Sequence, residues 1–220
     1  MYSVPVLELR TLPTIHPKVE ILLDCGISTI VRLSLDPTKL PSGTMNREVI
    51  VDWLSSQQSD KPQDCVVRIG WTDVPQAFAD GCERWTATKN APDITEQAAI
   101  GVMALLIHHL EKAEIQCVLQ IGSGGDYLLV VNGLPPMQIE SSGIHEDPQG
   151  YHSTARLKEK SGQVLTNCTT GFASVVAFSH SPNRDVYCKL HYVTKDAMAE
   201  KKSPVQNRSP KNPLSRKKRK

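Results

Sequence analysis

The pattern of hydrophobic and polar positions predicts a strand-rich first part of the chain. Short apolar runs at 4–12 and 65–71 are typical of strands. Residues 18–35 hold two further runs, which flank Cys25-Gly26-Ile27-Ser28 and predict a hairpin with its turn at those four residues. We therefore expect residues 1–90 to form a β-rich region that packs on the part of the chain that follows.

A long apolar helix is the strongest single prediction from the pattern. Asp93-Ile94-Thr95-Glu96 has the spacing of a capping box, with Asp93 as N-cap and Glu96 at the third helical position. Residues 98–107 are apolar on almost every side of a helix. A helix without a polar face is buried, so residues 94–111 are expected to pack against a sheet.

The second half of the chain alternates between strand and helix patterns. Turn residues separate three short apolar runs that predict strands at 115–121, 126–131 and 136–141. A helical pattern follows at 153–165, and two more strand patterns follow at 173–178 and 186–193. The predicted fold class is α+β with an α/β-like core. In that core, residues 91–196, a helix is followed by three strands, a helix and a strand.

Composition and charge narrow the class of protein. The 220 residues are 40% hydrophobic and 22% charged, which is typical of a soluble globular protein. No apolar run approaches the ~20 residues that span a bilayer, and the start shows no secretory signal. The six cysteines are widely spaced and predict reduced thiols. We therefore expect a cytoplasmic protein without a membrane partner.

The last segment of the chain has a different composition from the rest. Nine of the 25 basic residues lie within 201–220, which leaves 16 basic against 23 acidic residues elsewhere, a formal charge of −7. Residues 197–220 cannot form a core and are predicted to be a disordered basic tail. If the protein binds nucleic acid, the expected contacts are those of the tail: Lys201, Lys202, Arg208, Lys211, Arg216, Lys217, Lys218, Arg219 and Lys220.

Three acidic residues are the candidates for chemistry. Glu96 lies in the first turns of the predicted helix, Asp126 begins a strand after a glycine-rich turn, and Glu140 ends the next strand. This order can bring carboxylates together on one divalent cation, and Mg²⁺ prefers oxygen ligands. The constellation indicates a metal-dependent phosphodiesterase, with Glu96, Asp126 and Glu140 as candidate metal ligands.

The order of elements together with these acids resembles the core of the restriction-endonuclease-like, or PD-(D/E)xK, superfamily. The resemblance covers roughly 85–105 residues and implies a nuclease in which the helix supplies one acid, the second strand an Asp, and the third strand an acid two residues before a Lys. By position these are Glu96, Asp126 and Glu140. Ser142 stands where the resemblance implies the lysine.

A lysine elsewhere has to supply the missing positive charge if the chain is catalytic. The resemblance implies Lys158 or Lys160 on the following helix, because such a lysine can migrate to a neighbouring element. Gln138, two residues before Glu140, is a candidate for positioning water or the edge of a base. The candidate catalytic residues are therefore Asp126, Glu140, Gln138, Lys158 and Lys160.

Each acid also has an interpretation without chemistry. Glu96 can serve only the capping box, and Asp126 can serve only the turn before its strand. Glu140, at the end of an apolar strand, needs a partner or a metal if it is buried. Two other functions therefore stay open. One is a non-catalytic protein-interaction module of a prokaryotic defence or toxin-neutralising system, which the acidic body favours. The other is a structural protein that binds nucleic acid through its tail.

Overall fold

The computed structural model describes residues 4–33, 44–56, 61–72, 76–120, 125–145, 147, 150–178 and 186–196. Within these ranges the strands are β1 (Val6–Glu8), β2 (Thr44–Leu54), β3 (Gln63–Thr72), β4 (Glu114–Val118), β5 (Tyr127–Val130), β6 (Met137–Ile144), β7 (Thr170–Ala177) and β8 (Val186–Thr194). The helices are η1 (Leu9–Thr11), α1 (Leu12–Ile15), α2 (Ile21–Leu33), α3 (Gln76–Thr88), α4 (Ala91–Glu111) and α5 (Tyr151–Asn167).

All eight strands belong to one mixed sheet in the order β1-β3-β2-β8-β7-β6-β5-β4. The predicted α+β class is confirmed by this sheet and its helices. From α4 onward the elements are a helix, three strands, a helix and a strand, followed by β8. Strands β4, β5 and β6 form an antiparallel meander, and α5 crosses over to place β7 parallel to β6.

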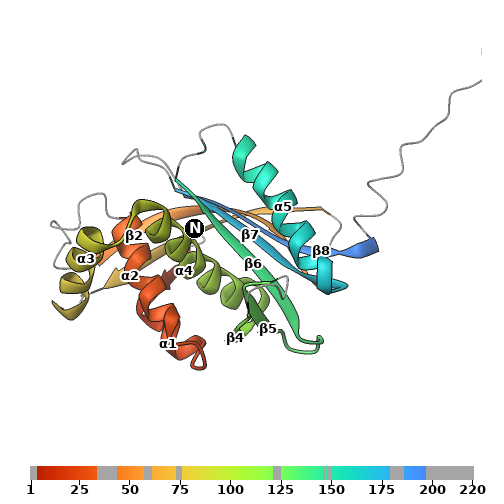
Figure 1. Cartoon of the computed structure of the whole chain (residues 1–220), viewed down its shortest axis with the longest axis horizontal. Helices are drawn as coiled ribbons and strands as arrows, with labels where there is room; N and C mark the ends of the chain where they lie inside the picture. Colours follow the sequence, from red (N-terminus) through yellow and green to blue (C-terminus); the bar gives the residue numbers. More distant parts are fainter. Residues whose placement is uncertain are drawn as a thin grey trace, which may run out of the picture.

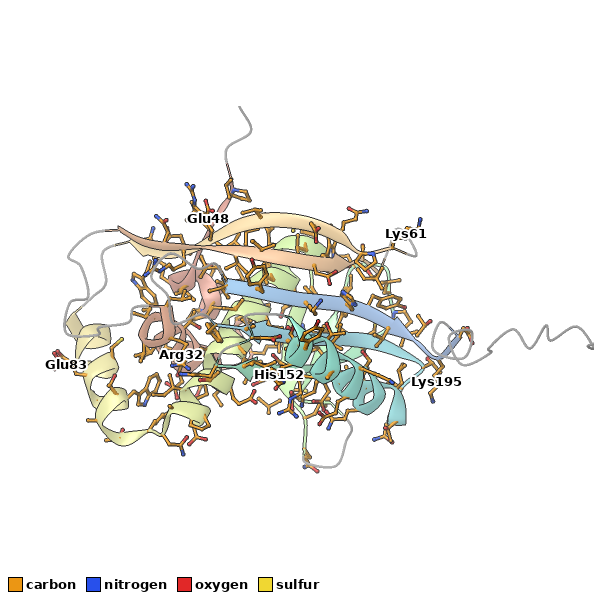
Figure 2. All side chains as sticks on the ribbon, turned by 90° about the horizontal axis from the view of Figure 1, so that it is seen from above. Arg32, Glu48, Lys61, Glu83, His152 and Lys195 are labelled. Carbon is orange, nitrogen blue, oxygen red and sulfur yellow. The ribbon has the colours of Figure 1, made fainter. Side chains whose placement is uncertain are left out.

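Helices cover the two faces of the sheet unequally. Figure 1 shows α4 and α2 on one face and α5 on the other, and α4 and α5 both contact β6 and β7. Seen from above, α5 lies over the β6 and β7 side, whereas no described helix covers the strands around Glu48 on this face (Figure 2). Strand β6 is therefore enclosed between α4 and α5, with one face toward each.

The N-terminal region is less β-rich than the sequence pattern predicts. Residues 18–35 were expected to form a hairpin, but Ile21–Leu33 is the helix α2. Of the predicted strand at 4–12, only Val6–Glu8 is extended. The buried residues Cys25 and Thr29 of α2, four positions apart, lie against Gly101 of α4, and Thr29 also donates a hydrogen bond to the Ala98 carbonyl. Packing against a second helix overrides the strand preference of the β-branched residues in this segment.

The start of α4 also differs from the prediction. The helix begins at Ala91, and its N-cap is Asn90, whose side chain accepts a hydrogen bond from the Asp93 backbone N–H at 2.9 Å. Pro92 fits the first turn because it has no N–H to leave unsatisfied and its φ is already helical. The capping box from Asp93 to Glu96 was therefore a wrong prediction, and the Glu96 carboxylate is available for another contact.

One hydrophobic core joins the two halves of the chain. Leu22 and Trp71 from the first half pack in the same buried cluster as Val102, Ile139 and Phe172 from the second half. A separate small cluster lies between α5 and the other face of the sheet. The predicted burial of the 94–111 helix against the sheet is confirmed by this packing.

Some predictions concern parts of the chain that the structure does not describe. The basic tail at 197–220 and residues 121–124 of the glycine-rich turn lie outside the described residues. None of the described helices combines the length and the apolar character that a bilayer-spanning helix requires. All six cysteines are free thiols.

Two helical glycines allow a matched test of the packing between α2 and α4. A Cβ on Gly101 of α4 would lie 2.4 Å from Thr29 Oγ1 and 2.8 Å from the Cys25 carbonyl oxygen, whereas a Cβ on Gly162 of α5 would meet nothing within 4 Å. We predict that Gly101→Ala lowers the free energy of unfolding by about 1–3 kcal/mol through overpacking. Gly162→Ala should raise it by up to about 1 kcal/mol through helix propensity.

Urea denaturation of the two variants checks this difference. Because both substitutions gain the same helix propensity, the contrast between them isolates the contact with α2. A Gly101→Ala variant as stable as Gly162→Ala contradicts the close packing of the two helices.

Candidate functional site

The candidate site lies where β6 extends beyond its neighbour β5. Strand β7 pairs with β6 from Gln138 to Ile144, but in the described part of the chain β5 pairs with it only from Met137 to Ile139. The N–H groups of the later residues of β6 on that side need other acceptors, because an unpaired buried backbone donor is costly. Two of the predicted acids supply them.

Asp126 is attached to β6 through both its backbone and its side chain. Its N–H donates to the Ile139 carbonyl, and its Oδ2 accepts a hydrogen bond from the Ser141 N–H, each at 2.9 Å. The register pairs Tyr127 with Ile139, so one residue further Asp126 stands opposite Glu140. Side chains directly opposite each other in an antiparallel pair lie on the same face of the sheet. The strands therefore bring the Asp126 and Glu140 carboxylates together.

Lys160 from α5 meets this pair. Its Nζ donates to Glu140 Oε2 at 2.6 Å, and only 16% of the Lys160 side chain and 9% of the Glu140 side chain are exposed. Both groups are largely removed from water, so their hydrogen bond is stronger than that of a surface ion pair. Lys158, the other lysine expected near the site, is exposed on the same helix.

The electrostatics of the site concern mainly Glu140. Burial raises the pKa of Glu140, and the neighbouring Asp126 raises it further through its negative charge and a hydrogen bond. The hydrogen bond and the positive charge of Lys160 oppose both effects. The pKa shift has the direction expected for two carboxylates sharing one site, although burial is its largest cause.

Glu96 approaches the same stretch of β6 from α4. Its Oε2 accepts a hydrogen bond from the Gly143 N–H at 2.8 Å, and its Oε1 accepts one from Ser142 Oγ at 3.1 Å. A Cβ on Gly143 would lie 2.4 Å from the Thr95 carbonyl oxygen, so α4 and β6 approach this closely only because residue 143 is glycine. Glu96 joins α4 to the end of β6, and Ser142, at the position expected for a lysine, is its partner.

Gln138 lies on the same face of β6 as Glu140, two residues away. Its Oε1 is buried without a hydrogen-bond partner among the described residues, and the Gln138 side chain lies against Gly125, the residue before Asp126. The structure thus brings Gln138, Asp126, Glu140 and Lys160 into one neighbourhood. Among the described residues, no group of three or more His, Cys, Asp or Glu side chains is arranged to hold a metal ion.

One polar cluster was missed by the sequence reasoning. Asp52 of β2 accepts hydrogen bonds from Lys189 Nζ at 3.1 Å and His191 Nε2 at 2.9 Å, and the bond from His191 is the main reason why the pKa of Asp52 is lowered. His191 pairs with Ala173, which pairs with Glu140, so this cluster lies on the same face two strands away. No local signal could reveal it, since Asp52 is 137 positions from Lys189 and 139 positions from His191.

No family model, curated protein or solved structure matches this chain.

The raised pKa of Glu140 predicts a pH dependence of stability. The folded chain holds the Glu140 proton more tightly than the unfolded chain, so ionisation of this group destabilises the fold. The quantity to compare is the free energy of unfolding of the wild type minus that of Glu140→Gln. This difference should fall as the pH rises from about 4.5, the ordinary pKa of Glu, through the raised pKa of Glu140. Urea denaturation at stepped pH, with a chelator present, measures this difference. A difference that stays constant or increases with pH contradicts the prediction.

Proposed function

We propose that this chain is a metal-dependent phosphodiesterase that cleaves nucleic acid, with Asp126 and Glu140 as metal ligands and Lys160 as the cationic group. The observation that carries the proposal is the contact of 2.6 Å between Lys160 and Glu140, beside Asp126. Lys160 supports the proposal because it brings to Glu140 the positive charge that the resemblance to the PD-(D/E)xK superfamily implies and that Ser142 does not supply.

The donor set supports Mg²⁺ as the metal. Two carboxylates face the same side of the sheet, and Mg²⁺ is commonly held by one or two carboxylates, with water and substrate phosphate in its other positions. The absence of a third suitable His, Cys, Asp or Glu among the described residues is therefore compatible with Mg²⁺. When bound, the ion would polarise the phosphate and the attacking water.

The residues of the chain then have separate tasks. Asp126 and Glu140 would hold the ion, and Lys160 Nζ would place a positive charge beside the phosphate oxygens, where negative charge develops. Gln138, whose Oε1 is buried and has no hydrogen-bond partner among the described residues, can accept a hydrogen bond from a water in the site. Glu96 keeps the end of β6 in place through Ser142 and Gly143, which makes it a positioning residue rather than a metal ligand.

A non-catalytic interaction module is the second candidate function. The observation that favours it is that every acid of the site already has a protein partner: Asp126 with the Ser141 N–H, Glu140 with Lys160, and Glu96 with Ser142 and Gly143. In this interpretation the carboxylates only stabilise the end of β6. The acidic body would then present a surface to a protein partner.

Metal binding separates the two functions. We predict that Mg²⁺ or Mn²⁺ raises the melting temperature of the wild type, because a ligand of the folded state stabilises it by about 2.7 kcal/mol at 100 times its Kd. Asp126→Asn and Glu140→Gln should lose this shift together with Mg²⁺-dependent cleavage of plasmid DNA or RNA. Glu159→Gln is the matched control, because Glu159 is a surface acid of α5 paired with the exposed Arg156.

Differential scanning fluorimetry and a gel assay make the two measurements. If the wild type shows neither a thermal shift nor cleavage, the phosphodiesterase proposal is contradicted and the non-catalytic interaction module is favoured.

The basic tail predicts how nucleic acid is bound. Nine positive charges should release several counterions, so affinity should fall steeply with salt, with a slope of about −0.9 per phosphate neutralised. Deleting residues 201–220 should abolish binding and leave the melting temperature nearly unchanged. Fluorescence anisotropy with a labelled oligonucleotide over a range of salt concentrations tests this expectation. Unchanged affinity in the truncated chain excludes the tail as the binding segment.

A further inference from the structure

The Lys160 ammonium lies beside the two carboxylates of the candidate site. Its Nζ lies 2.6 Å from Glu140 Oε2, and Glu140 shares its face of the sheet with Asp126. We infer that Lys160 is the internal occupant of the cation site formed by Asp126 and Glu140, so that a divalent cation that takes Glu140 Oε2 as a ligand displaces it. This inference rests on the proposed function and concerns how its metal site is regulated.

The two cations compete for one carboxylate oxygen. A Mg²⁺ ion bound through Glu140 Oε2 would lie about 2.0–2.1 Å from the oxygen that Lys160 now contacts. The metal and the ammonium would be two positive charges at close range in a place from which water is largely excluded, and their repulsion is strong there. Metal binding to the wild type therefore includes the loss of the bond between Lys160 and Glu140.

The position of the lysine on a helix makes this exchange feasible. A lysine at residue 142 would be fixed to the strand two residues from Glu140, whereas Lys160 reaches the carboxylate from α5 through a flexible four-carbon chain. The ammonium can leave Glu140 without any movement of β6, which Asp126 and Glu96 hold by the backbone. Once displaced, it stays tethered near the place where a phosphate would bind.

Exchange of the two cations affects both the affinity for metal and the availability of the Lys160 ammonium. The wild-type affinity for metal is weaker than the carboxylate pair alone would give, because binding has to break the internal ion pair. Metal loading also frees the Lys160 ammonium for a phosphate. Metal binding therefore both fills the site and releases the lysine, and the Lys160 ammonium neutralises the Glu140 carboxylate until metal is present.

Isothermal titration of Mn²⁺ into the full-length chain tests the inference without an activity assay. Lys160→Met keeps most of the side-chain volume and removes the charge, so it should bind Mn²⁺ at least about fivefold more tightly than the wild type, the lower end of typical coupling between sites. Lys158→Met, a change of an exposed lysine on the same helix, should leave the affinity unchanged. The Mn²⁺-induced rise in melting temperature should be larger for Lys160→Met than for the wild type.

Chemical labelling of the wild type keeps the test independent of any variant that folds poorly. With acetic anhydride and mass spectrometry, Mg²⁺ should increase the acetylation of Lys160 severalfold and leave that of Lys158 unchanged. Equal Mn²⁺ affinities for wild type and Lys160→Met, or a Lys160 label that does not respond to Mg²⁺ binding, overturn this inference and leave the proposed metal site intact. No Mn²⁺ binding to either protein overturns both.

Discussion

The candidate site depends on the edge of β6 beyond Ile139, where no described strand pairs with it on the β5 side. Beyond Ile139 this strand has β7 on one side, but on the other side the described part of β5 no longer pairs with it. Backbone N–H groups in a sheet have to find acceptors, and here they find carboxylates. Asp126 accepts from Ser141, and Glu96 accepts from Gly143. The same need for acceptors therefore explains why acidic residues from two other elements gather at this strand.

The need for backbone acceptors does not by itself decide whether these carboxylates only stabilise the strand or also bind a cation. An ionised carboxylate has about four acceptor positions, so one backbone hydrogen bond leaves Asp126 free to bind a cation as well. Glu140 is different, because its contact is with a charged lysine in a place with little access to water. A buried ion pair contributes little net stability compared with a well-packed apolar pair, so retention of such a pair for stability alone has a weak physical basis. The proposed exchange of cations would give this pair a function beyond stability.

The first half of the chain supports the site from a distance. Its strands β1, β3 and β2 extend the sheet from β8, and α2 holds α4 through the close contact at Gly101. Thr29 Oγ1 adds a hydrogen bond to the Ala98 carbonyl at this contact. Because Glu96 is on α4, the position of this helix also sets the position of the Glu96 carboxylate relative to Gly143. The two halves therefore share one core and contribute together to the geometry of the site.

The sequence by itself determined the elements whose patterns are strong and local. The all-round apolar helix, the α+β class and the short strands around Asp126 and Glu140 follow from hydrophobic period and turn residues, which depend only on neighbours in the chain. The identity of α2 did not follow, because its apolar positions fit both a strand and a helix, and only contact with α4 selects the helix. The N-cap was misplaced by three residues, since Asn90 and Asp93 are both suitable and the position of Pro92 decides between them.

The sequence also named the residues of the candidate site, but it did not show which of them contact one another. It named Glu96, Asp126, Glu140 and both lysines of α5, but the strand register placed Asp126 opposite Glu140, and the crossover of α5 selected Lys160 over Lys158. It offered Glu96 as a metal ligand or as part of a capping box, whereas the Glu96 carboxylate accepts hydrogen bonds from Ser142 and Gly143 at the end of β6. The Asp52 cluster was out of reach of sequence reasoning, because its partners come from strands far apart in the chain. Tertiary structure decided these contacts, because strand register and helix placement depend on packing across the whole sheet rather than on any local pattern.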